Sequence, residues 1–257
     1  MTVHFIGAGP GAADLITLRG AQTLARCQTC LYAGSLVPDE MLEHCPTDAV
    51  MIDTARMPLD EIIGHIRTAD AAGHDVARLH SGDPSLYSAV AEQIRALDAV
   101  GIGHTIVPGV PAFSAAAAAL GRELTVPGIG QSLLITRVST LSTDMPAGET
   151  LAELAATGVT LALHLAAHRV DQVQADLIEH YGPQCPCAVV AFASRDNEQI
   201  LRCTLDRLAA ETTAAGIVRT AVIFVGPVLA ASGFPDSYLY SQARMTKVAG
   251  ENGSART

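Results

Sequence analysis

The sequence predicts an α/β protein of two domains, in which strands alternate with helices and the sheets are mostly parallel. The composition supplies material for buried cores, because 49% of the 257 residues are hydrophobic and only 16% are charged. Short apolar runs alternate with amphipathic helical patterns along the first half of the chain. This alternation stops near residue 121 and then begins again, which indicates a second domain.

The first domain is expected to span residues 1–120. Apolar runs predict strands at 3–6, 29–33, 49–52, 76–80 and 104–107. Helical patterns between them predict helices at 16–26, 59–72, 85–97 and 112–120. In the helix at 59–72, Ile62, Ile63 and Ile66 share one face. Strands joined by helices form right-handed βαβ units, so we expect a parallel sheet.

The segment 121–132 reads GRELTVPGIGQS, has no helical period and is predicted to be an interdomain linker. The second domain is expected at 133–240, and a flexible tail follows at 241–257. Strands are predicted at 133–136, 160–165, 188–192 and 221–225, and helices at 151–156, 170–180 and 204–215.

The charge balance excludes some partners. The formal net charge is -10 and no basic stripe is present, so we expect no nucleic-acid partner. Lys247 is the one lysine, and the remaining basic residues are arginines. These arginines fit either carboxylate recognition or a plain compositional bias. No signal peptide or membrane-spanning run is visible, so we expect a cytoplasmic protein without a membrane partner.

The six cysteines predict no disulfide framework in a chain of this size. Cys27-x-x-Cys30 has the spacing of a redox or metal pair but lacks a second pair at zinc-site spacing. We therefore expect reduced, partly buried thiols and no metal site.

Glycine-rich turns follow three of the predicted strands. They are Gly7 to Gly11, Ser81 to Asp83, and Pro108-Gly109-Val110-Pro111. In an open parallel sheet, ligands bind beyond the carboxyl ends of the strands. Three such turns at one edge indicate a shared ligand cleft, although each turn alone fits a plain strand exit.

The turn SGDP has a structural interpretation of its own. Asp83 is predicted to cap a helix that begins near Ser85, and Pro84 fits the first helical position. Gly82 then permits a ligand or another chain segment to approach the end of the strand. Asp83 is also able to accept hydrogen bonds from a ligand.

The first turn formally matches the dinucleotide fingerprint, as Gly7-x-Gly9-x-x-Ala12. This match keeps an NAD(P)-dependent oxidoreductase as an alternative. Two features oppose it. Pro10 removes a backbone N–H from the place where phosphate oxygens would be held, and no acid follows the second strand near Gly34.

Successive stretches of the chain resemble one known family. FIGAGPGAADLITLRG, LHSGDPSLYSA and VPGVPAFSAAAAALG are similar, in this order, to signatures of the tetrapyrrole methyltransferases, the S-adenosylmethionine enzymes of cobalamin and sirohaem synthesis. TLALHLAA, AFASRDNEQILRCTL and TAVIFVGPVL continue the resemblance, which covers roughly residues 2–230. YAGSLVP and ITRVSTLSTDMPAGETL are most similar to the precorrin-4 C11-methyltransferase group, aerobic or anaerobic.

The resemblance implies two α/β domains with S-adenosylmethionine in a cleft between them, usually in a homodimer. It implies C-methylation of a precorrin in cobalamin biosynthesis, at C11 of precorrin-4 to give precorrin-5. Methylation of another ring position remains open. A non-catalytic binding module with a vestigial cleft remains a third class.

The resemblance also implies which residues contact the cofactor. Carried over motif by motif, they are Pro10, Ser81, Gly82, Asp83, Leu86, Pro111, Ala112, Leu165, Ser194, Thr220 and Ala221. The chain departs from the family at Leu165-Ala166, where relatives often have Met and a small residue. It also departs at Ser194-Arg195, where they often have Gly-Thr.

Substrate contacts are less well marked in the sequence. By resemblance, Tyr32 and Ser35 are expected to contact the tetrapyrrole. Arg137 follows the first strand of the second domain and is expected to grip a carboxylate. No catalytic base is assigned; His80, beside the second glycine turn, is a candidate, but a histidine at a strand end is more often structural.

Overall fold

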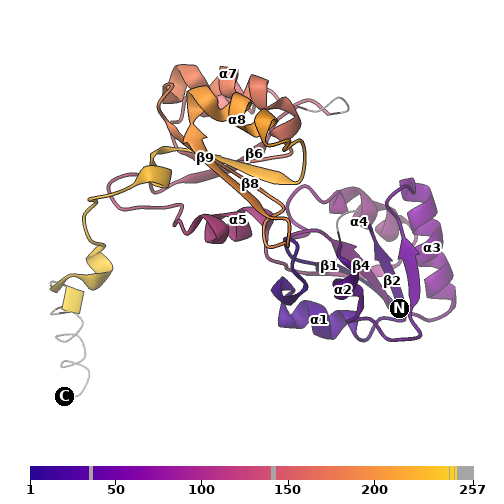
Figure 1. Cartoon of the computed structure of the whole chain (residues 1–257). Coiled ribbons are helices and arrows are strands. Elements are labelled where there is room, and N and C mark those ends of the chain that lie inside the picture. The colour runs from indigo at the N-terminus through magenta and orange to yellow at the C-terminus, as the bar shows by residue number, and fades with distance from the viewer. Residues whose placement is uncertain (35–36, 140–142, 243, 246, 248–257) are drawn as a thin grey trace, which may run out of the picture. The chain divides into compact units, whose positions relative to one another are not determined.

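The computed structural model describes residues 1–34, 37–139, 143–242, 244–245 and 247 (Figure 1). The chain divides into two compact units. The first unit is Met1–Ala119 with Phe192–Gln199, and the second is Leu120–Ala191 with Ile200–Thr257. The segment 192–199 therefore belongs to the first unit, although its neighbours in sequence belong to the second.

The first unit contains a sheet with the order β3-β2-β4-β1-β5. Its strands are β1 (Thr2–Gly7), β2 (Thr29–Tyr32), β3 (Val50–Asp53), β4 (Val76–His80) and β5 (Gly103–Val107). Every adjacent pair is parallel. The expected α/β class and parallel arrangement are confirmed here. The carboxyl ends of β4, β1 and β5 are consequently neighbours at one edge.

Helices cover both faces of this sheet (Figure 1). The helices on this sheet are α1 (Leu18–Leu24), α2 (Asp39–Leu42), α3 (Leu59–Ala71) and α4 (Val90–Ala99), while α5 (Ala112–Leu120) follows β5 and ends at the first residue of the second unit. Ile62 and Ile66 of α3 and Leu97 of α4 pack on one face. Leu24 of α1 and Met41 of α2 pack on the other. Two apolar layers thus hold the sheet rigid beneath the glycine turns.

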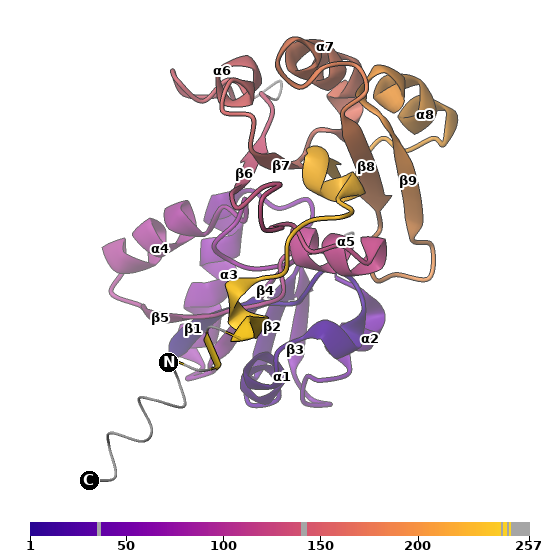
Figure 2. The same ribbon diagram turned by 90° about the vertical axis from the view of Figure 1, so that its left-hand side faces the viewer.

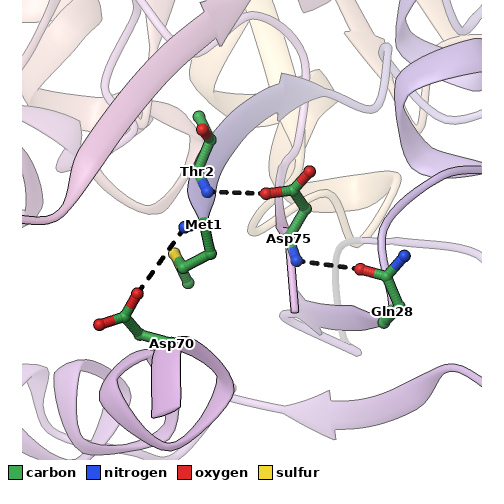
Figure 3. A network of polar contacts seen from close by, with 5 residues as sticks. All are labelled: Met1, Thr2, Gln28, Asp70 and Asp75. Atoms are coloured by element: carbon green, nitrogen blue, oxygen red, sulfur yellow. Dashed lines mark hydrogen bonds and ion pairs between the residues drawn. The ribbon is translucent and has the colours of Figure 1, made fainter. Parts of the chain in front are cut away.

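A polar network fixes the opposite, amino-terminal edge of the sheet (Figure 3). Asp75, just before β4, accepts a hydrogen bond of 2.7 Å from the backbone N–H of Thr2. The backbone N–H of Asp75 donates to Oε1 of Gln28 at 3.0 Å. The amino group of Met1 lies 3.9 Å from a carboxylate oxygen of Asp70. These contacts therefore hold the amino-terminal ends of β1, β2 and β4 in register.

The second unit contains a mixed sheet with the order β6-β7-β10-β8-β9. Its strands are β6 (Leu133–Arg137), β7 (Thr160–His164), β8 (Pro186–Ala191), β9 (Gln199–Thr204) and β10 (Ala221–Val225). β6 and β7 are parallel, whereas β10 is antiparallel to both β7 and β8. A mostly parallel second sheet was expected, and β9, which forms an edge of the sheet, was not expected at all.

Three helices of the second unit lie side by side over its sheet (Figure 2). They are α6 (Leu151–Ala155), α7 (Val170–Tyr181) and α8 (Leu208–Ala214). Short 3-10 turns occur at Ala13–Leu15, Ala167–Arg169, Leu205–Arg207, Pro227–Ala230 and Tyr238–Tyr240. The six cysteines are free thiols. Within the described residues, the helices are too short or too polar to cross a membrane.

The helix after the second glycine turn begins later than the sequence predicts. We expected Asp83 to cap a helix starting near Ser85, but α4 starts at Val90. Tyr87 and Ala89 have positive φ angles of 54° and 51°, and this left-handed backbone cannot continue a right-handed helix. Asp83 therefore caps no helix, and its carboxylate makes other contacts.

Strand β4 buries two ionisable side chains. Arg78 is 7% exposed, and it donates to Oε1 of Gln93 at 3.0 Å and to Oγ1 of Thr54 at 2.9 Å. Burial lowers the pKa of Arg78 to about 10. Burial, and then the charge of Arg78, lowers the pKa of His80 to about 3, although a hydrogen bond with the Ser88 backbone acts in the opposite direction. His80 is therefore neutral at physiological pH.

The three glycine turns touch one another through backbone atoms. A Cβ placed on Gly7 would lie 2.5 Å from Cα of Gly109 and 2.7 Å from the carbonyl oxygen of Gly82. A Cβ on Gly109 would overlap that same carbonyl oxygen. Contacts this close leave no room for a side chain, because the obstructing atoms are backbone. Glycine at these positions is required by close approach.

We predict that Gly109→Ala destabilises the first unit by at least about 2 kcal/mol, because the new methyl group must displace the backbone of β1 and the second turn. Urea denaturation measures this change. Gly64→Ala is the matched control, since nothing lies within 4 Å of a Cβ added at Gly64. In the middle of α3 this change should stabilise by about 0.5–1 kcal/mol. Equal effects at both positions would contradict the backbone contact.

Acid should destabilise the protein partly through His80. The unfolded chain protonates histidine near pH 6.5, whereas the folded chain keeps His80 neutral to about pH 3. The unfolded state therefore binds the extra proton, and stability falls as the pH drops below 6.5. Between pH 7 and pH 5 the wild type should lose about 2 kcal/mol more than His80→Gln. Denaturation curves at both pH values test this, with the exposed His44→Gln as control.

Candidate functional site

The carboxyl edge of the first sheet brings most of the expected cofactor residues together. Pro10 follows β1, Ser81 and Gly82 follow β4, and Pro111 with Ala112 follows β5. The first two turns are joined by reciprocal hydrogen bonds between Gly9 and Gly82, of 3.2 and 2.7 Å. A Cβ added at Gly82 would lie 3.7 Å from the backbone nitrogen of Ala112. Residues about 100 positions apart in the chain thus form one continuous rim.

Asp83 locks this rim with both carboxylate oxygens. Oδ2 accepts a hydrogen bond of 2.8 Å from the backbone N–H of Gly109, in the third turn. Oδ1 accepts from the backbone N–H of Ser85 at 2.8 Å and from the Ser85 hydroxyl. Partial burial alone would raise the pKa of Asp83, but these hydrogen bonds outweigh it and lower the pKa below its ordinary value. Asp83 is therefore an ionised clamp between two turns.

Backbone strain is concentrated in loops at the strand ends. Among the described residues other than glycine, left-handed φ values occur at Tyr87, Ala89, Leu165, Phe192, Ser194 and Thr220. This conformation is uncommon without glycine and is an outlier for a β-branched residue such as Thr220. Strain of this kind clusters at binding sites. Leu165, Ser194 and Thr220 also belong to the expected cofactor set, whereas Tyr87, Ala89 and Phe192 do not.

Ser194 reaches the first glycine turn. Its hydroxyl accepts a hydrogen bond of 3.0 Å from the backbone N–H of Ala12, and its own N–H donates to Oε2 of Glu198 at 2.7 Å. A Cβ on Gly11 would lie 2.6 Å from Cγ of Arg195, so the segment 192–199 packs directly on this turn. Ser194 therefore acts first as a support for the turn.

Within the second unit, Leu165 and Thr220 lie at one edge of the sheet. β10 is antiparallel to β7 and β8, so its first residue, Ala221, lies at the edge where β7 and β8 end. Leu165 follows β7 directly, has a φ of 52° and is 54% exposed. Burial lowers the pKa of the neighbouring His164 to about 4. This edge therefore carries an exposed apolar side chain at the end of β7.

The expected substrate residues are less clearly arranged. Tyr32 ends β2, and its carbonyl oxygen accepts a hydrogen bond from Thr54, which Arg78 in turn contacts. Ser35 lies outside the described residues. The guanidinium of Arg137 donates to the backbone carbonyls of Val138 and Thr143, at 3.1 and 3.4 Å. Its role as a carboxylate clamp stays a prediction.

Leu86 lies in the strained segment between Asp83 and α4, and it is partly exposed. The sequence did not reveal the supporting roles of Ser85 and Glu198, or the hydrogen bond that Gly109 of the third turn donates to Asp83. An aspartate two residues before a serine is the usual signal of a side-chain turn, so Asp83-Pro84-Ser85 contained the information for one of them. The partners of Gly109 and Glu198 depend on tertiary contacts that no local pattern shows.

The first turn does not have the geometry of a dinucleotide site. In the dinucleotide fingerprint a helix begins at the glycine turn and directs its N–H groups at the phosphates. Here a 3-10 turn at Ala13–Leu15 intervenes, and α1 begins only at Leu18. The backbone N–H of Ala12 is already bonded to Ser194. The turn fits a ligand that carries no pyrophosphate.

Comparisons with known proteins agree with this geometry. Residues 2–209 match the family model of tetrapyrrole (corrin/porphyrin) methylases. A precorrin-4 C(11)-methyltransferase of Rhodococcus erythropolis is 63% identical over 95% of this chain and 98% of its own length. A precorrin-4 C(11)-methyltransferase of Mycobacterium tuberculosis is 61% identical over 95% of this chain and 98% of its own.

A solved structure supports the same assignment. The X-ray structure of cobalt precorrin-4 methyltransferase, a cobalamin biosynthetic enzyme, matches with a TM-score of 0.86 and 35% identity. The match covers 89% of this chain and 95% of that structure. Since the family model spans most of the chain and these relatives match it almost from end to end, the chain belongs to the tetrapyrrole (corrin/porphyrin) methylase family.

Proposed function

We propose that this protein transfers a methyl group from S-adenosylmethionine to C11 of precorrin-4 in cobalamin biosynthesis, giving precorrin-5. The observation that carries the proposal is the 63% identity, over 95% of the chain, to a protein named precorrin-4 C(11)-methyltransferase. The structure adds a rim of glycine turns and strained residues at the strand ends, which is the type of site that a small cofactor requires.

The similarity favours the metal-free acceptor. Relatives named for precorrin-4 are 48% to 63% identical to this chain. Those named for cobalt-precorrin-4, from Methanocaldococcus jannaschii and Priestia megaterium, are 42% and 37% identical. The sequence identity thus falls from the first group of relatives to the second, while both groups match most of this chain. We therefore take precorrin-4 as the substrate and cobalt-precorrin-4 as the alternative.

The residues of the rim fit S-adenosylmethionine better than a nucleotide phosphate. Pro10 has no backbone N–H, and the backbone N–H of Ala12 already donates to Ser194. The first turn therefore has few N–H donors left for a phosphate. Pro111 and Ala112, in the first unit, are apolar groups suited to an adenine ring. Because Asp83 uses both oxygens within the fold, its contribution is to hold Gly82 and Gly109 in place.

The bound cofactor supplies a methyl group that its sulfonium already activates for attack by a carbon nucleophile. The protein's own work is then to align the two reactants and to exclude water. The glycine turns of the first unit serve alignment, because backbone contacts and the hydrogen bonds of Asp83 hold them together. His80 is a weak base at a pKa of about 3, so we assign it a positioning role in the rim.

Two further features belong to the proposal. We infer a homodimer from the resemblance to the family, and we expect the protein to act in the cytoplasm. The net charge of -10 opposes a polyanionic tetrapyrrole at long range, so the acceptor site requires local arginines. Arg137 is the arginine we assign to this role, alongside Tyr32 and Ser35 as acceptor contacts.

The experiment that tests the function is an acceptor assay with purified protein, S-adenosylmethionine, and either precorrin-4 or cobalt-precorrin-4. Mass spectrometry should show one added methyl group, and NMR should place it at C11. Calorimetric titration with S-adenosylhomocysteine and with NADH tests the cofactor separately. Binding of NADH alone would refute the proposal. Binding of S-adenosylhomocysteine without transfer to either acceptor would leave a binding module.

Asp83→Asn should both destabilise the first unit and weaken cofactor binding. The amide offers one acceptor oxygen in place of two, so either Gly109 or Ser85 faces an N–H group. Loss of a charged hydrogen bond costs about 1.5–3 kcal/mol. We expect a lower melting temperature and weaker S-adenosylhomocysteine binding together. Ser85→Ala is the control, since it removes one contact of Oδ1 and leaves the bond to Gly109. Lost binding at an unchanged melting temperature would instead indicate direct ligand contact.

Thr220→Asn should stabilise the fold while weakening cofactor binding. Asparagine tolerates the left-handed backbone that strains threonine, so the unfolding free energy should rise by about 0.5–1 kcal/mol. If the Thr220 side chain contacts the cofactor, the Kd for S-adenosylhomocysteine rises severalfold. Thr213→Asn, on the exposed side of α8, should change neither quantity. Denaturation and calorimetry on the same preparations separate the two effects.

A further inference from the structure

A pocket of about 410 Å³ lies within the second unit, away from the edge that carries Leu165 and Thr220. Its lining includes Pro186 at the start of β8 and Thr204 at the end of β9. Ala221, the first residue of β10, pairs with Ala191 at the other end of β8. Within the second unit, the pocket and the expected cofactor residues Thr220 and Ala221 thus lie toward opposite ends of the sheet.

Three arginines line this pocket, which we call the arginine pocket. They are Arg122, Arg202 and Arg207, and one acid, Glu211, accompanies them. The lining therefore carries three positive charges and one negative charge, in a chain whose net charge is -10. Local excess of positive charge against an acidic background favours a negatively charged ligand.

The three guanidinium groups are not consumed by the fold. Nη2 of Arg202 donates to the carbonyl oxygen of Leu120 at 3.1 Å, which orients the group and leaves its other N–H donors available. Nη2 of Arg207 pairs with Glu211 at 2.8 Å. Arg122 makes no hydrogen bond or ion pair with any residue that the structure describes. Together they offer forked donors, the geometry that matches carboxylates and phosphates.

The remaining walls are apolar or uncharged. Leu120, Ala188 and Leu229 supply hydrocarbon surface. Burial raises the pKa of Cys203 to about 11, with Glu211 adding to the shift, and burial likewise raises the pKa of Cys187. Both thiols are therefore protonated near neutral pH and form an uncharged part of the pocket wall. Within the part of the chain that the structure describes, no cluster of metal-binding side chains is present.

We propose that the arginine pocket binds a small organic anion that carries carboxylate or phosphate groups on an apolar body. The arginines grip the oxyanion and the hydrocarbon walls cover the body. The volume lies near the lower end of the range for small-molecule pockets, which suits a ligand smaller than a tetrapyrrole. This site is separate from the one proposed for methyl transfer and does not depend on it.

Calorimetric titration with four probes tests the proposal. Phthalate and phenyl phosphate carry an apolar body, whereas succinate and inorganic phosphate do not. We expect saturable binding, with phthalate or phenyl phosphate tighter than its counterpart by about tenfold, because only these two reach the walls. The better of the two identifies the ligand as a carboxylate or a phosphate. Failure of all four probes to bind saturably at millimolar concentration would overturn the proposal.

The matched variants are Arg122→Gln/Arg202→Gln in the pocket and Arg67→Gln/Arg95→Gln on exposed helix faces of the first unit. Both remove two positive charges. The pocket variant should weaken binding at least about tenfold and the control variant should not. Equal losses would assign the effect to net charge and refute the site.

Folding and activity are followed in the same preparations. If Arg202→Gln unfolds the protein, Arg202→Lys is used in its place, since lysine keeps the positive charge but lacks the two-pronged guanidinium donor. Undiminished binding in the lysine variant would refute recognition of the anion by the guanidinium group. Without a probe, the pocket variant should transfer methyl groups at the wild-type rate. The titration measures binding in the arginine pocket even if the protein methylates neither tested acceptor. Failure of the anion-binding proposal can therefore be distinguished from failure of the proposed methyl transfer.

Discussion

The backbone contact between Gly7, Gly82 and Gly109 is the constraint on which the first unit depends. Parallel strands β4, β1 and β5 deliver three turns to one edge, and the turns pack without side chains between them. Asp83 then adds a charged hydrogen bond from the second turn to the third. The apolar layers on both faces and the polar network at the amino edge hold the strands in the register that this contact needs. Backbone contacts therefore set the shape of the rim, and the Asp83 side chain adds to them.

Backbone strain occurs in both units at residues that we propose as cofactor contacts. Left-handed backbone at Leu165, Ser194 and Thr220 costs free energy that the surrounding fold must offset. In return, each residue is fixed in one orientation before any ligand arrives. For a methyl transfer in which the reacting groups already carry their activation, fixed orientation is the main contribution a protein makes. The strain therefore agrees with the proposed chemistry, although the family assignment rests on the comparisons.

The regular elements follow from local patterns, and the departures have identifiable causes. β4, β10 and α5 have the bounds that the sequence predicts, because each is a clear apolar or alanine-rich run with turn residues on both sides. The start of α4 was predicted too early because Tyr87 and Ala89 have left-handed backbone, and neither tyrosine nor alanine signals that conformation in a sequence. β9 was missed because an edge strand with weak alternation resembles a loop. The glycine turns were found, but the predicted helix-capping role of Asp83 was wrong, since its partner Gly109 lies 26 residues away.

The placement of 192–199 within the first unit has a consequence for how the chain folds. The first unit is not finished when residue 119 leaves the ribosome, because the hydroxyl that supports Ala12 belongs to Ser194. Residues 120–191 must be synthesised first, and β8 and β9 border the missing piece on either side. During translation, the first glycine turn therefore lacks the Ser194 hydroxyl on Ala12 and the packing of Arg195 on Gly11 until this segment is made. The last step in completing the first unit is delayed until much of the second has emerged, so the two units cannot mature as independent modules.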